Sequence, residues 1–188
     1  MEEFVFWFIV FYGLERLVET FWKRKKIHGH ITAHYTLHLL VSTHIIVFIV
    51  ALYECSERQF QNASVLEFIL GLALVGMAIV CRNWSIITLG PYHSIHIEMR
   101  EEHPLITSGP YRYIRNPYYV SNAAELMGFP IVAHAQLALL FSLFLYMPSL
   151  LLRLLLEERA LKAKFGALYS EYAARVPGLF PSLLGEVK

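Results

Sequence analysis

Five long apolar runs constrain the fold of this chain more than any other feature of the sequence. They cover approximately residues 4–22, 33–53, 65–81, 117–133 and 137–156. A bilayer core about 30 Å thick is crossed by a helix of about 20 mainly apolar residues. Only 16% of the residues are charged, whereas globular domains average roughly 25%. We therefore predict an all-α, polytopic membrane protein of about five transmembrane helices, forming a single domain over residues 1–188.

The distribution of basic residues predicts the orientation of these spans. Of the 16 Lys and Arg residues, all but Arg16 and Arg58 fall in residues 23–26, 82–116 or 153–188. Short loops with such a bias lie on the cytoplasmic side, so we expect the long polar loop and the C-terminal tail to be cytosolic. The net charge of +1 gives no basic face, so we expect no nucleic-acid partner.

The polar loop from Arg82 to Asn116 carries most of the candidate chemistry. It is rich in Gly, Pro, His and Tyr, and it contains the run HPLITSGPYR from His103 to Arg112. On its own, such a loop is typical of interfacial Tyr and Arg anchors. The amphipathic tail over residues 157–175 is predicted to form a helix on the membrane surface or over the loop.

Three charged residues within or beside the apolar runs are functional candidates. Arg153 and Glu157 are four residues apart, so both lie on one helical face, as a helix-end ion pair or as a cation and an anion facing a ligand. Glu125 lies inside an apolar run, where a carboxylate is a functional candidate by default; the alternative is a hydrogen bond to Asn122 or Arg16.

The two histidines His34 and His38 have a spacing that metal sites use. They have neither a nearby carboxylate nor an HExxH pattern. We therefore predict packing roles for them, and no metal site.

Several motifs, in order along the chain, resemble the isoprenylcysteine carboxyl methyltransferase family. They are HPLITSGPYR at 103–112, RNPYY at 115–119, the pair Glu157-Glu158, and then Phe165-Gly166, Tyr169, Tyr172 and Arg175 to Pro177. The resemblance covers about residues 82–181. It implies a membrane-embedded enzyme that uses S-adenosylmethionine, with the cofactor arriving from the cytosol. The acceptor it implies is lipophilic, a small molecule or a prenylated one, and reaches the site from the bilayer lipids.

The resemblance also implies which residues form the site, at about residues 96–119 and 153–158. Cofactor contacts fall on His96, His103, Pro104, Leu105, Ile106, Tyr111, Asn116, Pro117, Tyr118, Tyr119 and Glu157. The arginine that binds the substrate carboxylate falls on Arg153. This chain departs from the family pattern at His96, where the family has Gln, and at Asn116, where it usually has His. An Asn cannot be protonated, which excludes acid–base work at that position.

A softer resemblance extends over nearly the whole chain, to small bacterial members of the family. It implies a bacterial cell membrane and adds phenolic or pyrone lipids to the possible acceptors. An ionised carboxylate acceptor would need no general base, whereas a phenol, with a pKa near 10, would need one. Glu125 is the candidate for that base.

The predicted reaction is therefore methyl transfer to an oxygen of a lipophilic acceptor. Two alternatives remain open. One is a phospholipid N-methyltransferase, in which Arg153 would repel an ammonium substrate. The other is a membrane scaffold without catalytic activity.

Overall fold

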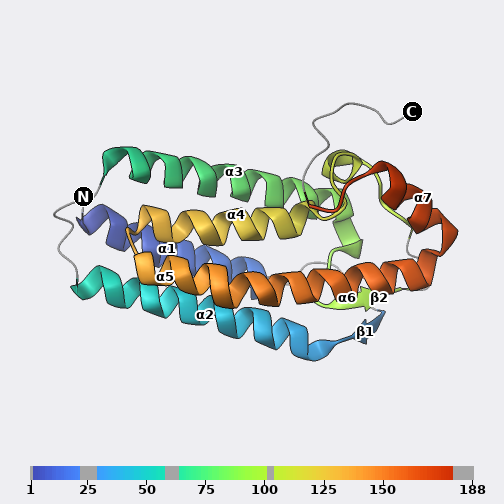
Figure 1. The fold of residues 1–188 in the computed structure, drawn as a ribbon, viewed down its shortest axis with the longest axis horizontal. Helices are drawn as coiled ribbons and strands as arrows, with labels where there is room; N and C mark the ends of the chain where they lie inside the picture. Colours follow the sequence, from blue (N-terminus) through green and yellow to red (C-terminus); the bar gives the residue numbers. More distant parts are fainter. Residues whose placement is uncertain (1, 22–28, 58–63, 101–103, 180–188) are drawn as a thin grey trace.

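The computed structural model describes residues 2–21, 29–57, 64–100 and 104–179, and it confirms the predicted helical class. Helices follow one another along the bundle (Figure 1) in the order α1 (Glu2–Phe21), α2 (His34–Glu57), α3 (Val65–Leu89), α4 (Pro117–Val132), α5 (Gln136–Phe141), α6 (Met147–Phe165) and α7 (Ala167–Arg175). The short helix α7 lies at one end of the bundle, and the start of α1 lies at the other (Figure 1).

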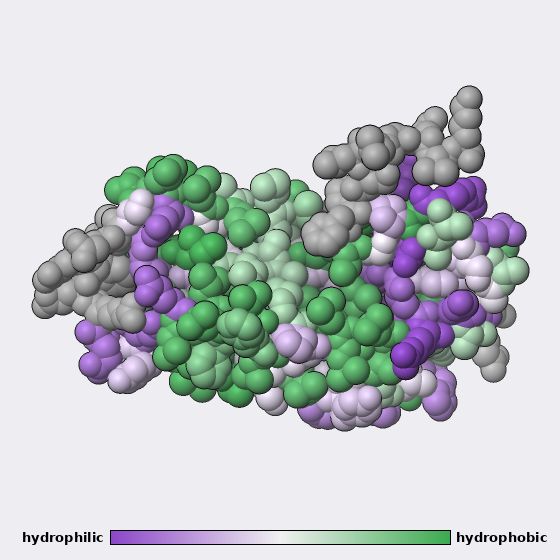
Figure 2. All heavy atoms as spheres, in the orientation of Figure 1, coloured by the Kyte–Doolittle hydropathy of each residue, from purple (hydrophilic) through white to green (hydrophobic). Residues whose placement is uncertain are grey.

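Among the described residues, three helical stretches are long and apolar enough to cross a membrane. They are α2, the stretch Val65–Tyr92 that contains α3, and the stretch Gln136–Phe165 that contains α5 and α6. Helices α1 and α4 contribute to the same hydrophobic core. Hydrophobic residues cover most of the middle of the visible face, and hydrophilic ones gather toward its ends (Figure 2). The count of five spans stays a prediction.

Two helix boundaries differ from those expected from hydropathy. Helix α3 continues past the predicted end at residue 81 to Leu89, so Arg82 lies inside a helix and not at the start of a loop. Helix α6 continues to Phe165, so the helix predicted over 157–175 is divided between the end of α6 and α7. Gly166, with φ of +54°, ends α6 before α7, because glycine adopts this conformation without a Cβ penalty.

A π-helical segment joins α5 to α6. It covers Ser142–Tyr146 and is flanked by regular helix on both sides. A π segment arises when one extra residue is accommodated inside an α-helix. The long helix Gln136–Phe165 therefore changes its register before it reaches Arg153 and Glu157.

A small antiparallel sheet lies at the polar end of the bundle. Strand β1 (His30–Thr32) pairs with strand β2 (Ile97–Met99), and His30 lies opposite Met99. Two 3-10 turns, η1 (Gly90–Tyr92) and η2 (Gly109–Arg112), complete the described polar segments. Strands this short carry too little period-2 alternation to be predicted from sequence.

Helices α3 and α4 pack closely because glycines face the contact. A Cβ built on Gly128 would meet Val75 Cγ2 at 2.9 Å, and one on Gly71 would meet the backbone nitrogen of Val132 at 2.9 Å. Small residues at such positions let helix backbones approach each other in membranes. On the opposite side of α4, Phe129 stacks on Tyr12 of α1, with ring centroids 4.7 Å apart. These contacts fix α4, whose first turns carry residues of the candidate site.

Candidate active site

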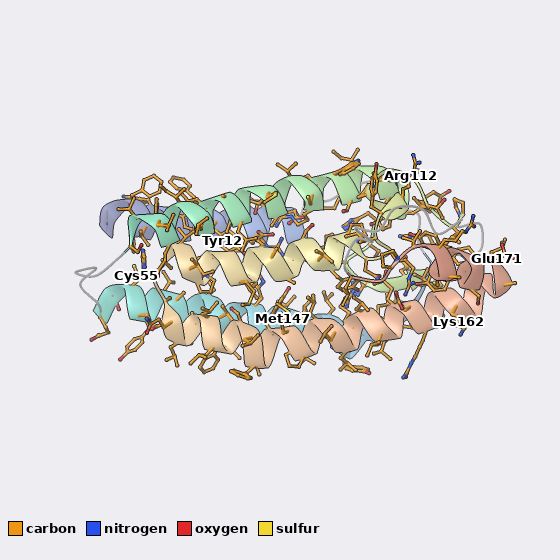
Figure 3. All side chains as sticks on the ribbon, turned by 45° about the horizontal axis from the view of Figure 1, so that its top comes forward. Tyr12, Cys55, Arg112, Met147, Lys162 and Glu171 are labelled. Carbon is orange, nitrogen blue, oxygen red and sulfur yellow. The ribbon has the colours of Figure 1, made fainter. Side chains whose placement is uncertain are left out.

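One cavity of about 710 Å³ extends from the polar end of the bundle into its apolar interior. Residues of α1, α2, α4, α6, β2 and the loop before η2 form its wall. In Figure 3, Tyr12 lies toward the middle of the bundle, whereas Arg112, Lys162 and Glu171 lie toward the end that carries α7. The cavity wall contains charged side chains such as Arg153 and Glu157. It also contains apolar ones such as Leu40 and Phe48, so a ligand in this cavity would touch both a polar and an apolar environment.

Most of the predicted site residues meet in the wall of this cavity. Those that line it are His96, Pro104, Leu105, Ile106, Tyr111, Asn116, Tyr118, Tyr119, Arg153 and Glu157. Pro117 is buried as the first residue of α4 and is not part of the lining. His103 lies outside the described residues. Glu125 is buried deeper in the bundle, outside the lining.

Tyr119 connects α4 to the two charged residues of α6. Its hydroxyl donates a hydrogen bond to the Glu157 carboxylate and also lies within hydrogen-bond reach of Arg153. A charge-assisted hydrogen bond of this kind is stronger than one between neutral groups. The contact therefore holds a carboxylate in a defined position in the cavity wall.

Arg153 is buried and held by partners on two other elements. One guanidinium nitrogen donates to Thr36 Oγ1 at 3.0 Å, and the other donates to the backbone carbonyl of Ile95. A guanidinium has five N–H donors, so these two bonds leave further donors for a ligand. The cation is thus fixed in orientation while it still lines the cavity.

A tyrosine of η2 and a tyrosine of α7 meet in the cavity wall. The hydroxyl of Tyr172 donates a hydrogen bond to the backbone carbonyl of Tyr111 at 2.6 Å. Burial raises the pKa of Tyr172 to about 12. Burial, and then the nearby Glu157 carboxylate, raise the pKa of the Tyr111 phenol well above its usual value. Both phenols are therefore protonated at neutral pH.

Arg115, Asn116 and Glu158 tie the start of α4 to α6 and the C-terminal segment. The guanidinium of Arg115 pairs with the Glu158 carboxylate at 3.0 Å, and it also donates to the carbonyl of Val176 at 2.8 Å. The amide of Asn116 donates to Glu158 at 2.7 Å and to the carbonyl of Gly178 at 3.1 Å. Asn116 thus has a structural role beside its place in the cavity wall.

A cluster of five charged side chains lies beside the cavity, and one of them, Arg16, lines it. Arg82, which is 0% exposed, pairs with Glu125, which is 1% exposed, with Glu15 at 2.6 Å and with Glu19 at 3.3 Å. Arg16 pairs with Glu19 at 3.0 Å and with Glu125 at 3.5 Å. Glu125 is therefore ion-paired with Arg16, one of the two partners that the sequence left as the alternative to a catalytic role. Sequence reasoning missed the role of Arg82. The sequence did contain an indication of this role, because an arginine inside a membrane-spanning segment usually pairs with acidic side chains.

The apolar arm of the cavity lies between α1 and α2. Its wall includes Val10, Gly13, Leu14, Leu17, Leu37, Leu40, Val41, Ile45, Phe48 and Leu52. Leu14, Leu17 and Ile45 are also 53%, 55% and 49% exposed on the molecular surface. The lining of this arm thus includes apolar side chains that are about half exposed.

Comparison with known proteins identifies relatives over most of the chain. Residues 69–163 match the family described as the isoprenylcysteine carboxyl methyltransferase (ICMT) family. The cobalt-zinc-cadmium resistance protein CzcN of Cupriavidus metallidurans is 30% identical over 146 residues, which are 74% of this chain and 61% of that protein. The protein-S-isoprenylcysteine O-methyltransferase B of Arabidopsis thaliana is 27% identical over 153 residues, which are 80% of this chain and 75% of that protein.

The fold also resembles a solved structure, that of the eukaryotic intramembrane Ras methyltransferase ICMT. The TM-score is 0.57 at 24% sequence identity, and the match covers 82% of this chain and 55% of that one. The chain thus spans less than two thirds of the length of both CzcN and this solved structure. At that identity, the structural match supports the membrane fold alone.

Proposed function

The chain is a membrane-embedded member of the isoprenylcysteine carboxyl methyltransferase family, and from that premise we propose that it transfers the methyl group of S-adenosylmethionine to an oxygen of a lipophilic acceptor. The observation that carries this proposal is one cavity with a polar end and an apolar arm. A polar cofactor and an apolar acceptor need such a pair of environments in contact with each other. A membrane scaffold without catalytic activity would need no such cavity.

The polar end fits the chemistry of the cofactor. Glu157 offers a carboxylate, held by Tyr119, to a cationic or hydroxyl-bearing ligand. The protonated phenol of Tyr111 and the apolar side chains of Leu105 and Ile106 lie in the same wall. Aromatic and aliphatic surfaces suit a heterocyclic base, and a few placed polar groups orient it. We propose that these residues, with the other predicted contacts, hold the cofactor.

The apolar arm fits an acceptor with a long hydrocarbon part. Leu14, Leu17 and Ile45 line the arm and are about half exposed. Small movements of these side chains would let a lipophilic chain pass from the bilayer into the cavity. We propose that the acceptor, prenylated or otherwise lipophilic, reaches the site by this route, with membrane lipids as the surrounding solvent.

Arg153 orients the acceptor in this proposal. When bound, the cofactor supplies an electrophilic methyl group, and the protein supplies positioning and exclusion of water. A fixed guanidinium binds a carboxylate through two parallel hydrogen bonds and favours a phenolate over the phenol. It disfavours the ammonium form of an amine, so the geometry favours an oxygen acceptor over phospholipid N-methylation.

Glu125 has a supporting role in this scheme. Its carboxylate already pairs with Arg82 and Arg16, and it lies outside the cavity lining. We propose that it positions Arg16, which does line the cavity, and that an ionised carboxylate acceptor reacts without a general base. For a phenolic acceptor, Glu125 would act only indirectly, by holding the Arg16 guanidinium in a fixed position in the cavity wall.

The polar end is proposed to face the cytoplasm, in a bacterial cell membrane. The bias of basic residues toward this end supports that orientation. A cytosolic cofactor could then reach Glu157 and Tyr119 without crossing the bilayer.

Two measurements on the purified chain test the proposed function. The first is calorimetric binding of S-adenosylhomocysteine, which is expected for the enzyme and not for a scaffold. The second is transfer of a labelled methyl group from S-adenosylmethionine to a farnesylcysteine analogue, to alkylpyrones and to a lipid extract, measured in parallel. No binding and no transfer would refute the proposal. Transfer to phospholipid amines alone would refute the oxygen acceptor.

A further inference from the structure

The aromatic ring of Phe48 stands near the deep end of the apolar arm. Phe48 on α2 and Gly13 on α1 both line the cavity. Helix α2 begins at the polar end of the bundle, and α1 begins at the opposite end (Figure 1). Of the described residues of these two helices that line the cavity, only Val10 and Leu52 therefore lie deeper than the level of Gly13 and Phe48. Most of the arm lies between this level and the polar end.

Gly13 provides the space in which the Phe48 ring sits. A Cβ built on Gly13 would lie 2.8 Å from Cε2 of Phe48 and closer still to Cζ, which is nearer than real Cβ atoms come to other heavy atoms. Small residues at such positions let neighbouring helices pack closely in membranes. The ring thus occupies volume that any side chain at position 13 would need.

The Phe48 ring also packs against the core of the bundle. It stacks on Phe129 of α4, with ring centroids 5.8 Å apart and ring planes at 15°. Phe129 is 0% exposed, and it stacks in turn on Tyr12 at 4.7 Å. A close-packed core yields little to an added atom. A side chain at position 13 would therefore displace the Phe48 ring into the cavity that it already lines.

The register of α2 gives the distance from the charged site to this ring. Arg153 donates a hydrogen bond to Thr36 Oγ1 at 3.0 Å, so Thr36 marks the level of Arg153 on α2. From Thr36 to Phe48 the helix rises by roughly 18 Å. An acceptor with its anionic end at Arg153 would bring its apolar chain to the Phe48 ring after about this length.

We propose that the Phe48 ring limits the length of the apolar chain that the arm accepts, and that Gly13 keeps this ring seated against α1, clear of the arm. The inference rests on the proposed function, and it adds to that function the residues that select acceptors by chain length. Phe48 and Gly13 are specificity-determining residues in this scheme, without contact with the reacting groups.

Binding of probes with one head group and different chain lengths tests the proposal. The probes are the decyl, tetradecyl, octadecyl and docosyl thioethers of N-acetylcysteine, which share one carboxylate. Binding is measured by calorimetry to the full chain in nanodiscs saturated with S-adenosylhomocysteine. Because chain length also alters partitioning into the bilayer, each probe is compared between protein variants.

The variants change the two residues separately and together. They are Gly13→Ala, Phe48→Ala and the double variant. Gly76→Ala is the matched control, because a Cβ on Gly76 of α3 would meet nothing within 4 Å and Gly76 is not part of the cavity lining.

We expect Gly13→Ala to weaken binding of the longest probe that the wild type binds by roughly fivefold or more, as in an overfilled apolar site. Its affinity for the decyl probe should be unchanged. Phe48→Ala should improve binding of the longer probes relative to the decyl one. In the Phe48→Ala background, Gly13→Ala should no longer alter the dependence on length, because the ring that it displaces is absent. Gly76→Ala should behave as the wild type does.

Three results would overturn the length limit. They are an effect of Gly13→Ala that is equal for all chain lengths, the same effect of Gly13→Ala with and without the Phe48 ring, and the absence of binding by every probe to a wild type that binds S-adenosylhomocysteine. A wild type that does not bind S-adenosylhomocysteine would instead overturn the proposed function.

Discussion

The hydroxyl of Tyr119 on α4 donates a hydrogen bond to the carboxylate of Glu157 on α6, which joins two residues that are 38 positions apart in the sequence. Both side chains line the same cavity. In the proposed function, this contact fixes the carboxylate that binds the cofactor. Substitutions of Glu157 and of Tyr119 distinguish what each residue contributes to cofactor affinity.

Replacing Glu157 with alanine is expected to weaken binding of S-adenosylhomocysteine by more than tenfold. The variant loses a charged hydrogen-bonding group in the cavity, which is worth about 1.5–3 kcal/mol. Calorimetry on the purified protein measures the effect. Arg159→Ala, on the exposed side of the same helix, serves as the control and should bind as the wild type does. Unchanged affinity in Glu157→Ala would remove Glu157 from the cofactor site.

Replacing Tyr119 with phenylalanine should have a smaller effect on the same affinity. The ring stays in place, while the hydrogen bond that orients Glu157 is lost, at a cost of about 0.5–1.5 kcal/mol. We expect binding of S-adenosylhomocysteine to weaken less than in Glu157→Ala. In the double variant, the second substitution should add little, because both act on one contact. Fully additive effects would show that the two residues act independently.

Replacing Arg153 with lysine is expected to preserve cofactor affinity and to abolish most turnover of an acidic lipophilic acceptor. Lysine keeps the charge but lacks the planar fork that binds a carboxylate through two hydrogen bonds. Methyl-transfer rates and calorimetry on the same preparation test this, with Arg159→Lys as the control. Near-normal turnover would leave Arg153 with a structural role and would favour an amine acceptor again.

Replacing Arg82 with methionine should destabilise the protein strongly. The substitution leaves the buried Glu125 carboxylate without its closest cation, and breaking a buried ion pair costs about 3–5 kcal/mol. Reversible unfolding in mixed micelles measures the loss, and Arg112→Met, at an exposed position, is the control. Adding Glu125→Gln should recover part of the stability, because it removes one uncompensated charge. A change below about 1 kcal/mol for Arg82→Met would contradict the burial of this cluster.

Topology reporters test the orientation of the bundle. A reporter fused after Lys188 is expected on the cytoplasmic side, and one inserted between α2 and α3, near Gln59, on the outside. The physical reason is the bias of basic residues toward the polar end of the bundle. Reversed results at both positions would reject the cytosolic route of the cofactor.

The membrane class and part of the polar end of the cavity wall could be predicted from the sequence, because both depend on local patterns along the chain. Apolar runs of sufficient length identify helices in a bilayer. The motifs around Tyr111, Tyr119 and Glu157 resemble a family, and the structure brings these three residues into one cavity. Their roles in binding the cofactor remain predictions.

Other features could not be predicted, because they depend on partners that are distant in the sequence. Hydropathy falls at Arg82, which suggested the end of a helix, yet the arginine lies in the bundle with carboxylates from α1 and α4. Thr36, which holds Arg153 from 117 residues away, is one of several polar residues in the apolar helix α2. No local pattern distinguishes it from other threonines.

The π-helical segment at Ser142–Tyr146 has a consequence for how this chain tolerates insertions and deletions. Each residue of an α-helix turns the following ones by about 100°. The wider turn of the π segment absorbs one extra residue, so deletion of one residue between Ser142 and Tyr146 would restore a regular helix and leave Arg153 and Glu157 facing the cavity. The same deletion in regular α6, between Met147 and Arg153, would instead turn both side chains away from the cavity by about 100°. Both deletions leave a continuous apolar helix of nearly the same length, so both variants are expected to enter the membrane, and the charges are expected to stay in the cavity wall only in the first.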